Sequence, residues 1–577
     1  MRSAILQILS DSGCTDVNKV RDLARTSSQG LSSLNESILS ADLVEEENFL
    51  EKVSHHFKMD WLPEPEPDLD QRKALQKACK AGVVVRHRIL PIRFEGDPDD
   101  SSAKLIIATS DPFDVVTRQM ATREFAYPLR WVLAPQKRVL EGIQALYGVG
   151  ADTFEAILEG RSDFDSNSDL KEETTDLDEN DAEASVVRFV NDIIRDALNQ
   201  RSTDIHLEPL SHDLRIRYRI DGVLQEVPVP EQIKTLQSSV ISRLKVMARL
   251  DIAEKRKPQD GRIALQLDGR SIDVRVATIP SVEGESISLR LLGQESFSLD
   301  RLGLIEAHQK TIDQLLKEPN GIVLVTGPTG SGKSTTLYTF LSALNDGSHR
   351  IVTVEDPVEH KLPGVIQIAV KPDIDLTFAA GLRSILRADP NVIMVGEIRD
   401  LETAEIAIRS ALTGHLVFST LHTNDAIGGI TRLVDMGVEP FLVGASVRAF
   451  IGQRLVRRLC PDCRVPANYS TPELDTVEFP SNLRTDGNLH TAKPGGCKSC
   501  RGTGYRGRIA IFEICRISEA LQDLIVGQKP YASLRRQAEA EGFISMRQYG
   551  WMKVAEGETT LEEVVSATAD ERNAGPK

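Results

Sequence analysis

A glycine-rich run in the middle of the chain constrains its fold more than any other feature. The run comprises Gly327, Pro328, Thr329, Gly330, Ser331, Gly332, Lys333, Ser334 and Thr335, and it follows the apolar stretch 322–325, which predicts a buried strand. Three glycines let the backbone curl so that successive N–H groups point inward, and the positive end of the following helix adds to the attraction for anions. This pattern predicts a site for a nucleoside triphosphate, and a plain glycine turn between strand and helix is the alternative.

Two side chains of this run have chemistry that suits ATP and its metal ion. We expect Lys333 to reach the β- and γ-phosphates, and we expect the Ser334 hydroxyl to hold Mg²⁺. Hydrolysis of ATP also needs a positioned water molecule and donors that stabilise the transition state, so acidic residues and histidines are expected close to this loop.

The size and composition predict a protein of several domains. A length of 577 residues exceeds what one hydrophobic core supports and predicts about three to five folded units. No apolar stretch approaches the roughly 18 residues that cross a bilayer, and the N-terminus lacks a signal-peptide core, so we expect a cytoplasmic location. The net charge of −16 argues against a dominant interaction with nucleic acid, because that binding relies on lysine and arginine.

The first half of the chain predicts four segments. Residues 1–55 have no assignable role, and residues 56–150 mix helical and strand-like patterns that predict a small α/β domain with no visible catalytic motif. Residues 151–185 carry many acidic and few apolar side chains, which predicts a flexible, self-repelling linker. In residues 186–297, alternating runs meet at two Asp-Gly turns, 221–222 and 268–269, which predicts an α+β domain built on an antiparallel sheet.

The second half predicts three further segments. In residues 298–455, strands alternate with helices, and the continuous apolar runs 322–326, 351–354, 392–395 and 416–420 are typical of strands buried on both faces. This pattern predicts a doubly wound α/β domain that binds nucleotide through its phosphate loop. Residues 456–508 form a tetracysteine module, and residues 509–577 are expected to form a helical C-terminal region.

Polar side chains follow the ends of these apolar runs, and open parallel sheets bind ligands at that edge. Glu397, after the run 392–395, is our candidate for orienting or polarising the attacking water, with a solvated loop carboxylate as the alternative. Glu355 and Asp356, after the run 351–354, fit either a catalytic role or hydrogen bonding that orders their loop.

Two histidines and one aspartate complete the candidates in this domain. His415 and His422 bracket the run 416–420, and we expect them to sense phosphate or to couple hydrolysis to motion, although a lone histidine is usually structural. Asp400 precedes the expected helix 401–412 and is predicted to cap its N-terminus, which is a structural role.

Four cysteines in two C-x-x-C pairs, Cys460, Cys463, Cys497 and Cys500, form the second sharp signal. Four thiolates in two pairs suit a closed tetrahedral Zn²⁺ site, and a reducing compartment disfavours disulfides. We therefore predict a structural zinc site, and a redox dithiol is the alternative for either pair alone. The basic residues Arg454, Arg457 and Arg458 lie just before it and predict an exposed helix face, or else a contact with acidic lipid or a partner protein.

Taken in order, these motifs resemble those of the type II secretion and type IV pilus assembly ATPases. Residues 327–334, 355–357, 386–400 and 413–424 look like the Walker A, Asp-box, Walker B and His-box motifs of that family. The resemblance extends back through 202–209, 217–222 and 257–262, so that it covers roughly residues 186–556, and it covers 61–147 more loosely.

The resemblance implies an ATP-driven motor, hexameric in its working form, with ATP between two large domains. It implies a RecA-like phosphate-loop domain preceded by a PAS-like α+β domain. It also implies that Arg275 and Arg290 approach the γ-phosphate from the amino-terminal side, whereas the residues alone would favour a solvated strand face. Asn391 stands where the family often has aspartate. Gly396 stands where many phosphate-loop enzymes have a metal-binding aspartate, which predicts a water-bridged metal contact.

The leading functional hypothesis is a cytoplasmic motor ATPase that powers type II protein secretion or type IV pilus assembly. The amino-terminal domain would dock on a platform protein of the inner membrane. The alternative is a zinc-containing ATPase for nucleic-acid translocation or DNA uptake, which the acidic charge and the lack of interleaved aromatic and basic residues disfavour. A nucleotide-binding scaffold without turnover is a third hypothesis, which the presence of Lys333 and Glu397 disfavours.

Overall fold

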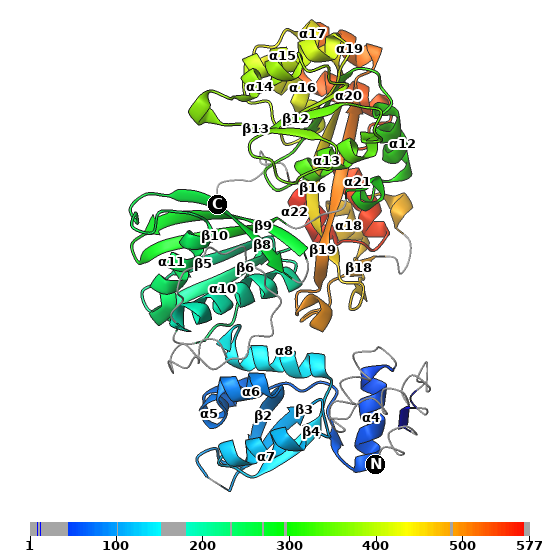
Figure 1. Ribbon diagram of the computed structural model, residues 1–577. Coiled ribbons are helices and arrows are strands. Elements are labelled where there is room, and N and C mark those ends of the chain that lie inside the picture. The colour runs from blue at the N-terminus through cyan, green and yellow to red at the C-terminus, as the bar shows by residue number, and fades with distance from the viewer. Residues whose placement is uncertain are drawn as a thin grey trace. The chain divides into compact units, whose positions relative to one another are not determined.

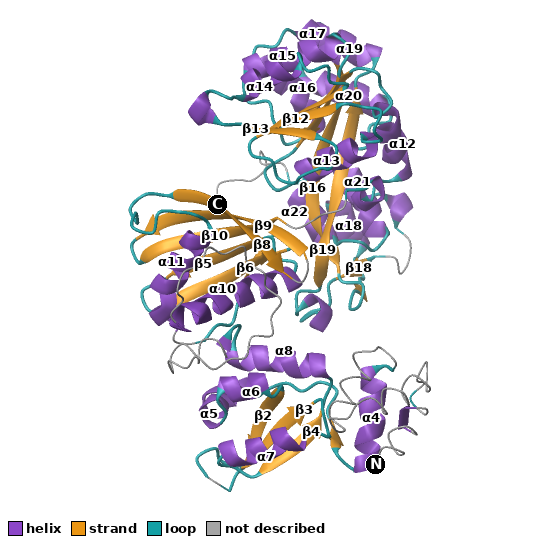
Figure 2. Cartoon of the chain, in the orientation of Figure 1, coloured by secondary structure: helices purple, strands orange, loops and turns teal. Residues whose placement is uncertain are grey.

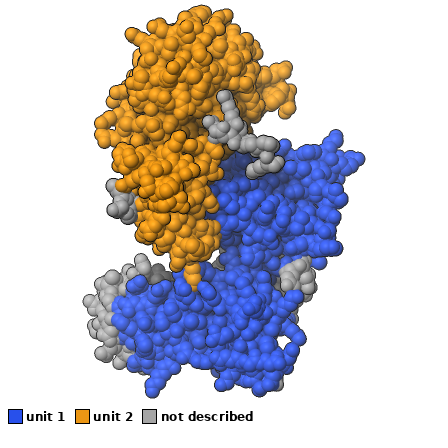
Figure 3. Space-filling view, turned by 180° about the vertical axis from the view of Figure 1, so that it is seen from behind, with its two compact units in different colours: residues 1–293 blue, residues 294–577 orange. Residues whose placement is uncertain are grey.

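The structure, a computed structural model, describes residues 8–9, 12, 44–100, 102–151, 181–230, 233–267, 270–292, 297–484 and 489–569. The chain divides into two compact units, residues 1–293 and 294–577 (Figures 1 and 3). Most of the predicted acidic linker and nearly all of the first 43 residues lie outside the described part, so the finer division into seven segments stays a prediction. None of the helices within the described ranges is long and apolar enough to cross a membrane.

The first part of unit 1 contains a four-stranded sheet, with strand order β1-β4-β3-β2. Strand β3 runs parallel to β4 and antiparallel to β2, and the strand-like runs expected near residues 104 and 129 are therefore confirmed. The strands are β1 (Asp60–Trp61), β2 (Ile89–Glu95), β3 (Lys104–Thr109) and β4 (Leu129–Leu133), and the helices are α4 (Glu46–Phe57), α5 (Arg72–Ala78), α6 (Ala81–Arg86), α7 (Val115–Glu124) and α8 (Gln136–Tyr147).

The second part of unit 1 is an antiparallel six-stranded sheet, with strand order β7-β6-β5-β10-β9-β8. Asp221 and Gly222 form the predicted hairpin turn with φ of 50° and 88°, as a type I′ turn requires. The elements are α10 (Asp181–Asn199), β5 (Asp204–Pro209), β6 (Leu214–Ile220), β7 (Val223–Glu226), α11 (Gln237–Met247), β8 (Gln259–Leu267), β9 (Arg270–Ser281) and β10 (Gly284–Leu292). Residues 268–269, the second predicted turn, lie outside the described residues.

Unit 2 is built on a seven-stranded sheet, with strand order β13-β12-β14-β15-β11-β16-β19. All neighbours are parallel except β16 and β19. The strands are β11 (Gly321–Thr326), β12 (Ile351–Glu355), β13 (Ile366–Ala369), β14 (Val392–Val395), β15 (Leu416–Leu421), β16 (Val447–Leu459) and β19 (Tyr505–Arg516). All four predicted apolar runs are therefore strands, buried as expected.

Helices cover both faces of this sheet, which confirms the predicted doubly wound architecture (Figure 2). One face packs against α14 (Phe378–Ile385), α15 (Leu401–Leu412), α16 (Ala426–Asp435) and α17 (Pro440–Ser446). The other face packs against α12 (Glu306–Leu315), α13 (Lys333–Leu344) and α21 (Met546–Ala555). Successive residues of β11 alternate between the two cores, with Leu324 in the first and Val323 and Val325 in the second.

Two expectations about the C-terminal part are wrong. Arg454, Arg457 and Arg458 lie on strand β16 and not on a helix face, and residues 509–516, expected to be helical, belong to β19. These segments pair with each other, and β16 also pairs with β11, so ladder hydrogen bonds override local propensity. Arg457 accordingly makes an internal ion pair with Glu563, at 2.6 Å.

The remaining elements surround the cysteines and end the chain. The elements around the cysteines are β17 (Val465–Pro466), α18 (Thr471–Thr476) and β18 (His490–Thr491), and the other C-terminal helices are α19 (Glu519–Val526), α20 (Tyr531–Ala540) and α22 (Leu561–Ala567). A small core of their own, which includes Phe479 and Trp551, joins this region to α21 and α22. The cysteine module is therefore packed on the C-terminal helices.

The predicted N-cap of α15 is confirmed, because the Asp400 carboxylate accepts the backbone N–H of Thr403 at 2.8 Å. We predict that Asp400→Ala lowers the stability of unit 2 by about 1 kcal/mol, since an N–H of the first turn loses its acceptor. Thermal unfolding of the full chain measures this as a lower apparent melting temperature. Asp400→Asn, which retains a capping oxygen, is the control, and equal melting temperatures for all three proteins would contradict the assignment.

Candidate functional site

The glycine-rich loop joins β11 to α13, as the sequence predicted. Gly327, Gly330 and Gly332 have φ of 147°, 80° and 87°, a region that other residues rarely adopt. A β-carbon at Gly327 would lie 2.4 Å from the backbone oxygen of Gln453, so the loop also needs glycine there for space. The backbone is thus curled in front of the first turn of α13, in the arrangement that binds phosphate through N–H groups.

Lys333, the first residue of α13, is buried against this loop. Its ammonium group donates to the backbone oxygens of Gly327 and Pro328, at 2.8 and 2.9 Å. Burial lowers the pKa of Lys333 from its ordinary value, and the negative charge of Glu397 partly offsets that shift. The Ser331 hydroxyl is also buried, with no hydrogen-bond partner among the described residues. The loop therefore holds a cation and an unused polar group where phosphate oxygens would bind.

Glu397 and His422 meet at the same edge of the sheet, beyond the carboxyl ends of β14 and β15. The His422 Nε2 atom lies 3.1 Å from a Glu397 carboxylate oxygen, and Arg399 makes an ion pair with the other oxygen. Burial raises the pKa of Glu397, but the hydrogen bonds and charges of Arg399 and His422 outweigh it and hold that pKa below its usual value. Glu397 is thus an ionised acceptor whose negative charge acts on the lysine of the phosphate loop.

Arg399 was part of the Walker B-like run, but no specific role was predicted for it. In the structure its guanidinium group bridges Glu397 and Asp356, and the distance to the Asp356 carboxylate is 3.8 Å. The only sequence signal was its position two residues after Glu397. Asp356 therefore contacts the site through Arg399.

Glu355 is buried, and its contacts are those of a residue that orders its loop. One carboxylate oxygen accepts the Thr353 hydroxyl at 2.6 Å and the Gln367 amide at 3.0 Å, and the other accepts the Tyr338 hydroxyl. The Tyr338 oxygen in turn accepts the backbone N–H of Glu359 at 3.0 Å. The geometry favours the structural alternative for Glu355, and a catalytic role for it stays a prediction.

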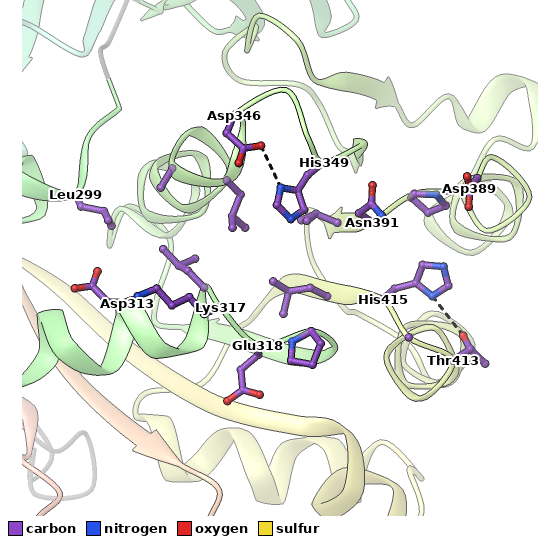
Figure 4. A pocket seen from close by; sticks show the side chains of 18 residues that line it. Leu299, Asp313, Lys317, Glu318, Asp346, His349, Asp389, Asn391, Thr413 and His415 are labelled. Atoms are coloured by element: carbon purple, nitrogen blue, oxygen red, sulfur yellow. Dashed lines mark hydrogen bonds and ion pairs between the residues drawn. The ribbon is translucent and has the colours of Figure 1, made fainter.

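His415 precedes β15, so the structure places it at the opposite edge of the sheet from the phosphate loop. Its Nδ1 atom lies 2.8 Å from the backbone oxygen of Ser410, in the last turn of α15. It lines a cavity of about 860 Å³ with His349, Asn391 and Lys317, which all precede strands of the sheet (Figure 4). Unit 2 therefore brings His422, and not His415, to the predicted nucleotide site.

The two predicted arginines lie in unit 1, where they are direct cross-strand neighbours. Arg275 on β9 is the register partner of Arg290 on β10, and Arg290 is the partner of Asp204 on β5. Asp204 accepts the Arg290 Nε–H at 3.0 Å and lies 3.7 Å from the Nε atom of Arg219. The register extends this row to Arg262 on β8. Arg219 and Arg262 lie in the motifs that carry the family resemblance, but no role was predicted for them, because strand register is a long-range property.

The four predicted cysteine ligands converge. The Sγ atoms of Cys460, Cys463, Cys497 and Cys500 all lie within 4.8 Å of one another. Burial raises the pKa of Cys463. Burial also acts to raise the pKa of Cys500, but the N–H groups of Cys497 and Gly504 donate to its sulfur and lower that pKa to about 6. A set of four sulfur ligands with a stabilised thiolate has the chemistry of a closed zinc site.

Two buried polar residues of the β16–β19 pair were not found from sequence. Gln453 on β16 lies behind the phosphate loop, and Glu513 on β19 accepts the N–H groups of Ala426 and Met546 at 2.7 and 3.0 Å. Burial raises the pKa of Glu513. Because α16 begins at Ala426, just after the loop of His422, Glu513 fixes one end of that loop. Neither β16 nor β19 was predicted as a strand, so no sequence signal pointed to these two residues.

The strand, loop and helix around Lys333, with Glu397 at the same sheet edge, define a phosphate-loop nucleotide-binding protein. The chain matches the family described as "Type II/IV secretion system protein" over residues 179–566 and the MshEN domain over residues 62–153. Because the first match spans more than half of its length, the chain belongs to the type II/IV secretion system protein family.

Three curated relatives agree with this assignment. Type II secretion system protein E of Pseudomonas aeruginosa is 48% identical over 416 residues, which cover 72% of this chain and 82% of the relative. Type II secretion system ATPase E of Vibrio cholerae is 45% identical over 454 residues, 78% of this chain and 87% of the relative. Type IV pilus assembly ATPase PilB of Myxococcus xanthus is 41% identical over 514 residues, 88% of each chain.

The contacts of Glu397 predict a pH effect. In Arg399→Gln the guanidinium charge is lost while burial remains, so the pKa of Glu397 rises, and the acidic limb of the kcat profile for ATP hydrolysis moves to higher pH. Phosphate release measured as a function of pH tests this. Arg409→Gln removes an exposed arginine of α15 and is the control. An acidic limb at the wild-type pH in Arg399→Gln would contradict the role given to this ion pair.

Proposed function

We propose that this protein is a cytoplasmic motor ATPase, peripheral to the inner membrane, that powers type II protein secretion or type IV pilus assembly. The observation that carries the proposal is the convergence of the phosphate loop, Lys333 and the Glu397–His422 pair at one sheet edge of unit 2. The names of the relatives from Pseudomonas aeruginosa and Myxococcus xanthus support both alternatives, secretion and pilus assembly.

In this proposal residues 327–335 bind the triphosphate through their backbone N–H groups, except for Pro328, which has none. Lys333 exchanges its two carbonyl acceptors for oxygens of the β- and γ-phosphates, which requires no large movement because its ammonium group already lies at the loop. The Ser334 hydroxyl holds Mg²⁺, which, when bound, neutralises phosphate charge. Gly396 offers no carboxylate at the end of β14, so a contact from that position to the ion would have to run through water.

The ionised Glu397 accepts a hydrogen bond from the attacking water and orients it toward the γ-phosphorus. His422 contacts the same carboxylate and begins the segment that leads to α16, so it links the presence of the γ-phosphate to the position of that helix. The predicted functional roles of His415 and Glu355 are indirect in this proposal. In unit 2, His415 contacts helix α15, and Glu355 accepts hydrogen bonds from residues of β12, β13 and α13.

Arg275 and Arg290 of unit 1 supply positive charge to the γ-phosphate from outside unit 2. Guanidinium groups suit this role because they donate several hydrogen bonds in a fixed geometry. Asp204 orients Arg290 through the Nε–H and leaves the terminal nitrogens of that guanidinium group for phosphate. The working form is a homo-oligomer, which we infer to be a hexamer, and the domain that matches MshEN docks on a platform protein of the inner membrane.

The tetracysteine cluster holds a structural Zn²⁺ ion. Cys460, Cys463, Cys497 and Cys500 supply all four ligands of a tetrahedral site and leave no open position for catalysis. Cys460 and Cys463 follow β16, and Cys497 and Cys500 precede β19, so these four residues would hold the ion between the two ends of the intervening segment.

Replacing the proposed catalytic carboxylate tests the enzymatic assignment. We predict that Glu397→Gln lowers kcat for phosphate release by at least about 100-fold, since a positioned base contributes that much or more, and that MgATP binding is retained. Glu405→Gln, an exposed acid on α15, is the matched control and keeps the wild-type rate. Equal rates for wild type and Glu397→Gln would refute the assignment.

The zinc assignment is tested by metal content. Purified wild-type protein is expected to hold one Zn²⁺ ion per chain, and Cys497→Ser is expected to lose it and to melt at lower temperature, because a three-thiolate site binds the ion less tightly. Cys515→Ala removes a buried thiol outside the cluster and should keep the zinc. Metal analysis that finds no zinc in wild type, or full zinc in Cys497→Ser, contradicts the assignment.

A further inference from the structure

Gln453 lies directly behind the phosphate loop, although it is far from that loop in sequence. It belongs to β16, which runs parallel to β11, and Gly452 is the register partner of Thr326, the last residue of β11. Gln453 is the next residue of β16, so it lies beside the point where β11 ends and the loop begins. Its backbone oxygen and its side-chain Nε2 lie so close to the loop that a β-carbon at Gly327 or Gly332 would meet them, at 2.4 and 2.8 Å.

The side chain of Gln453 is 2% exposed and is bonded to the helix that follows the loop. Its Oε1 atom accepts the hydroxyl of Thr336 at 2.7 Å, and this hydrogen bond is fully buried. Thr336 lies in the first turn of α13 and donates its backbone N–H to the oxygen of Gly332, the last residue of the loop. The amide of Gln453 thus contacts both the end of the loop and the first turn of the helix.

A buried amide at this position needs an explanation, because an apolar side chain of the same size would avoid the cost of taking an amide out of water. Its neighbours along β16 include Ile451, which is buried in the sheet core, so the surroundings themselves would accept an apolar residue. The bond to Thr336 does not join two parts of the core. It joins the strand to the element that carries Lys333 and Ser334.

We propose that Gln453 is a positioning residue of the nucleotide site. It holds the loop 327–332 and the first turn of α13 in the shape that receives the β-phosphate, so that nucleotide binding does not have to order them. The inference rests on the proposed function, because it assumes that the loop binds nucleotide. It goes further, since it assigns part of the affinity to a side chain that does not touch the nucleotide.

The test is binding of MgADP to the full-length protein by calorimetry, which avoids hydrolysis. Gln453→Leu keeps the approximate size of the side chain and removes the bond to Thr336, and it is expected to raise the Kd for MgADP about five- to tenfold, the net effect of one buried hydrogen bond. The KM for ATP rises in parallel while kcat at saturating ATP stays close to the wild-type value, because Gln453 does not act on the γ-phosphate.

A second variant separates positioning from folding. Thr336→Val removes the other partner of the same bond without changing the size of that side chain, and it should weaken MgADP binding in the same direction. The double variant should bind MgADP no more weakly than the weaker-binding single variant, because the two substitutions remove the same hydrogen bond. Should Gln453→Leu fail to fold, Thr336→Val alone decides the matter.

The increase in melting temperature on adding MgADP is a measurement that a merely structural role of Gln453 would not change. The increase in melting temperature on adding MgADP should shrink in both variants, whatever their stability without nucleotide. Ser446→Ala, which loses a buried hydroxyl bond in α17, is the control and should keep the wild-type Kd. A wild-type Kd in both loop variants overturns the proposal, whereas a wild-type protein that does not bind MgADP overturns the proposed function instead.

Discussion

The nucleotide site depends on one backbone constraint, the curl of residues 327–332 between β11 and α13. Three glycines with positive φ produce that curl, and two of them also lie against Gln453 where a side chain would clash. Because the backbone itself supplies the N–H groups, the shape of the loop matters more than the identity of most of its side chains. The parallel sheet then determines what surrounds the loop, since every strand that ends beside β11 delivers its next residues to the same edge.

Burial and hydrogen-bond partners distinguish the proposed catalytic carboxylate of unit 2 from a carboxylate that orders its loop. Glu397 is partly exposed, ionised by Arg399 and His422, and close enough to Lys333 to influence its pKa. Glu355 is the last residue of the neighbouring strand β12, and both of its carboxylate oxygens accept hydrogen bonds inside the protein. Both were candidates from sequence, and burial and partners separate them where composition could not.

Much of the fold and of the candidate site could be predicted from local sequence. The apolar runs, the glycine loop, the Asp221-Gly222 hairpin, the cap at Asp400 and the convergence of four cysteines all follow from short-range rules, and all are present. The errors have one cause, which is long-range pairing. Arg454, Arg457 and Arg458 on β16 were interpreted as an exposed helix face, because the pairing of β16 with β11 and β19 cannot be seen in a short window.

The same cause explains the residues that were misplaced or missed. His415 and His422 flank one strand in sequence, but a strand has two ends, and only one end faces the phosphate loop. Cross-strand register placed Arg219 and Arg262 in a row with the predicted arginines, and it placed Gln453 beside the loop. Each of these positions depends on which strands are neighbours in the sheet.

The most direct measurement of the central claim is the affinity of the purified protein for MgATP, compared between wild type and Lys333→Ala. If the curled loop and its lysine bind the triphosphate, wild type binds MgATP and Lys333→Ala binds it at least about tenfold more weakly. This is the effect expected for the loss of a charged hydrogen bond. Equal binding by both proteins, or no binding by wild type, would contradict the account.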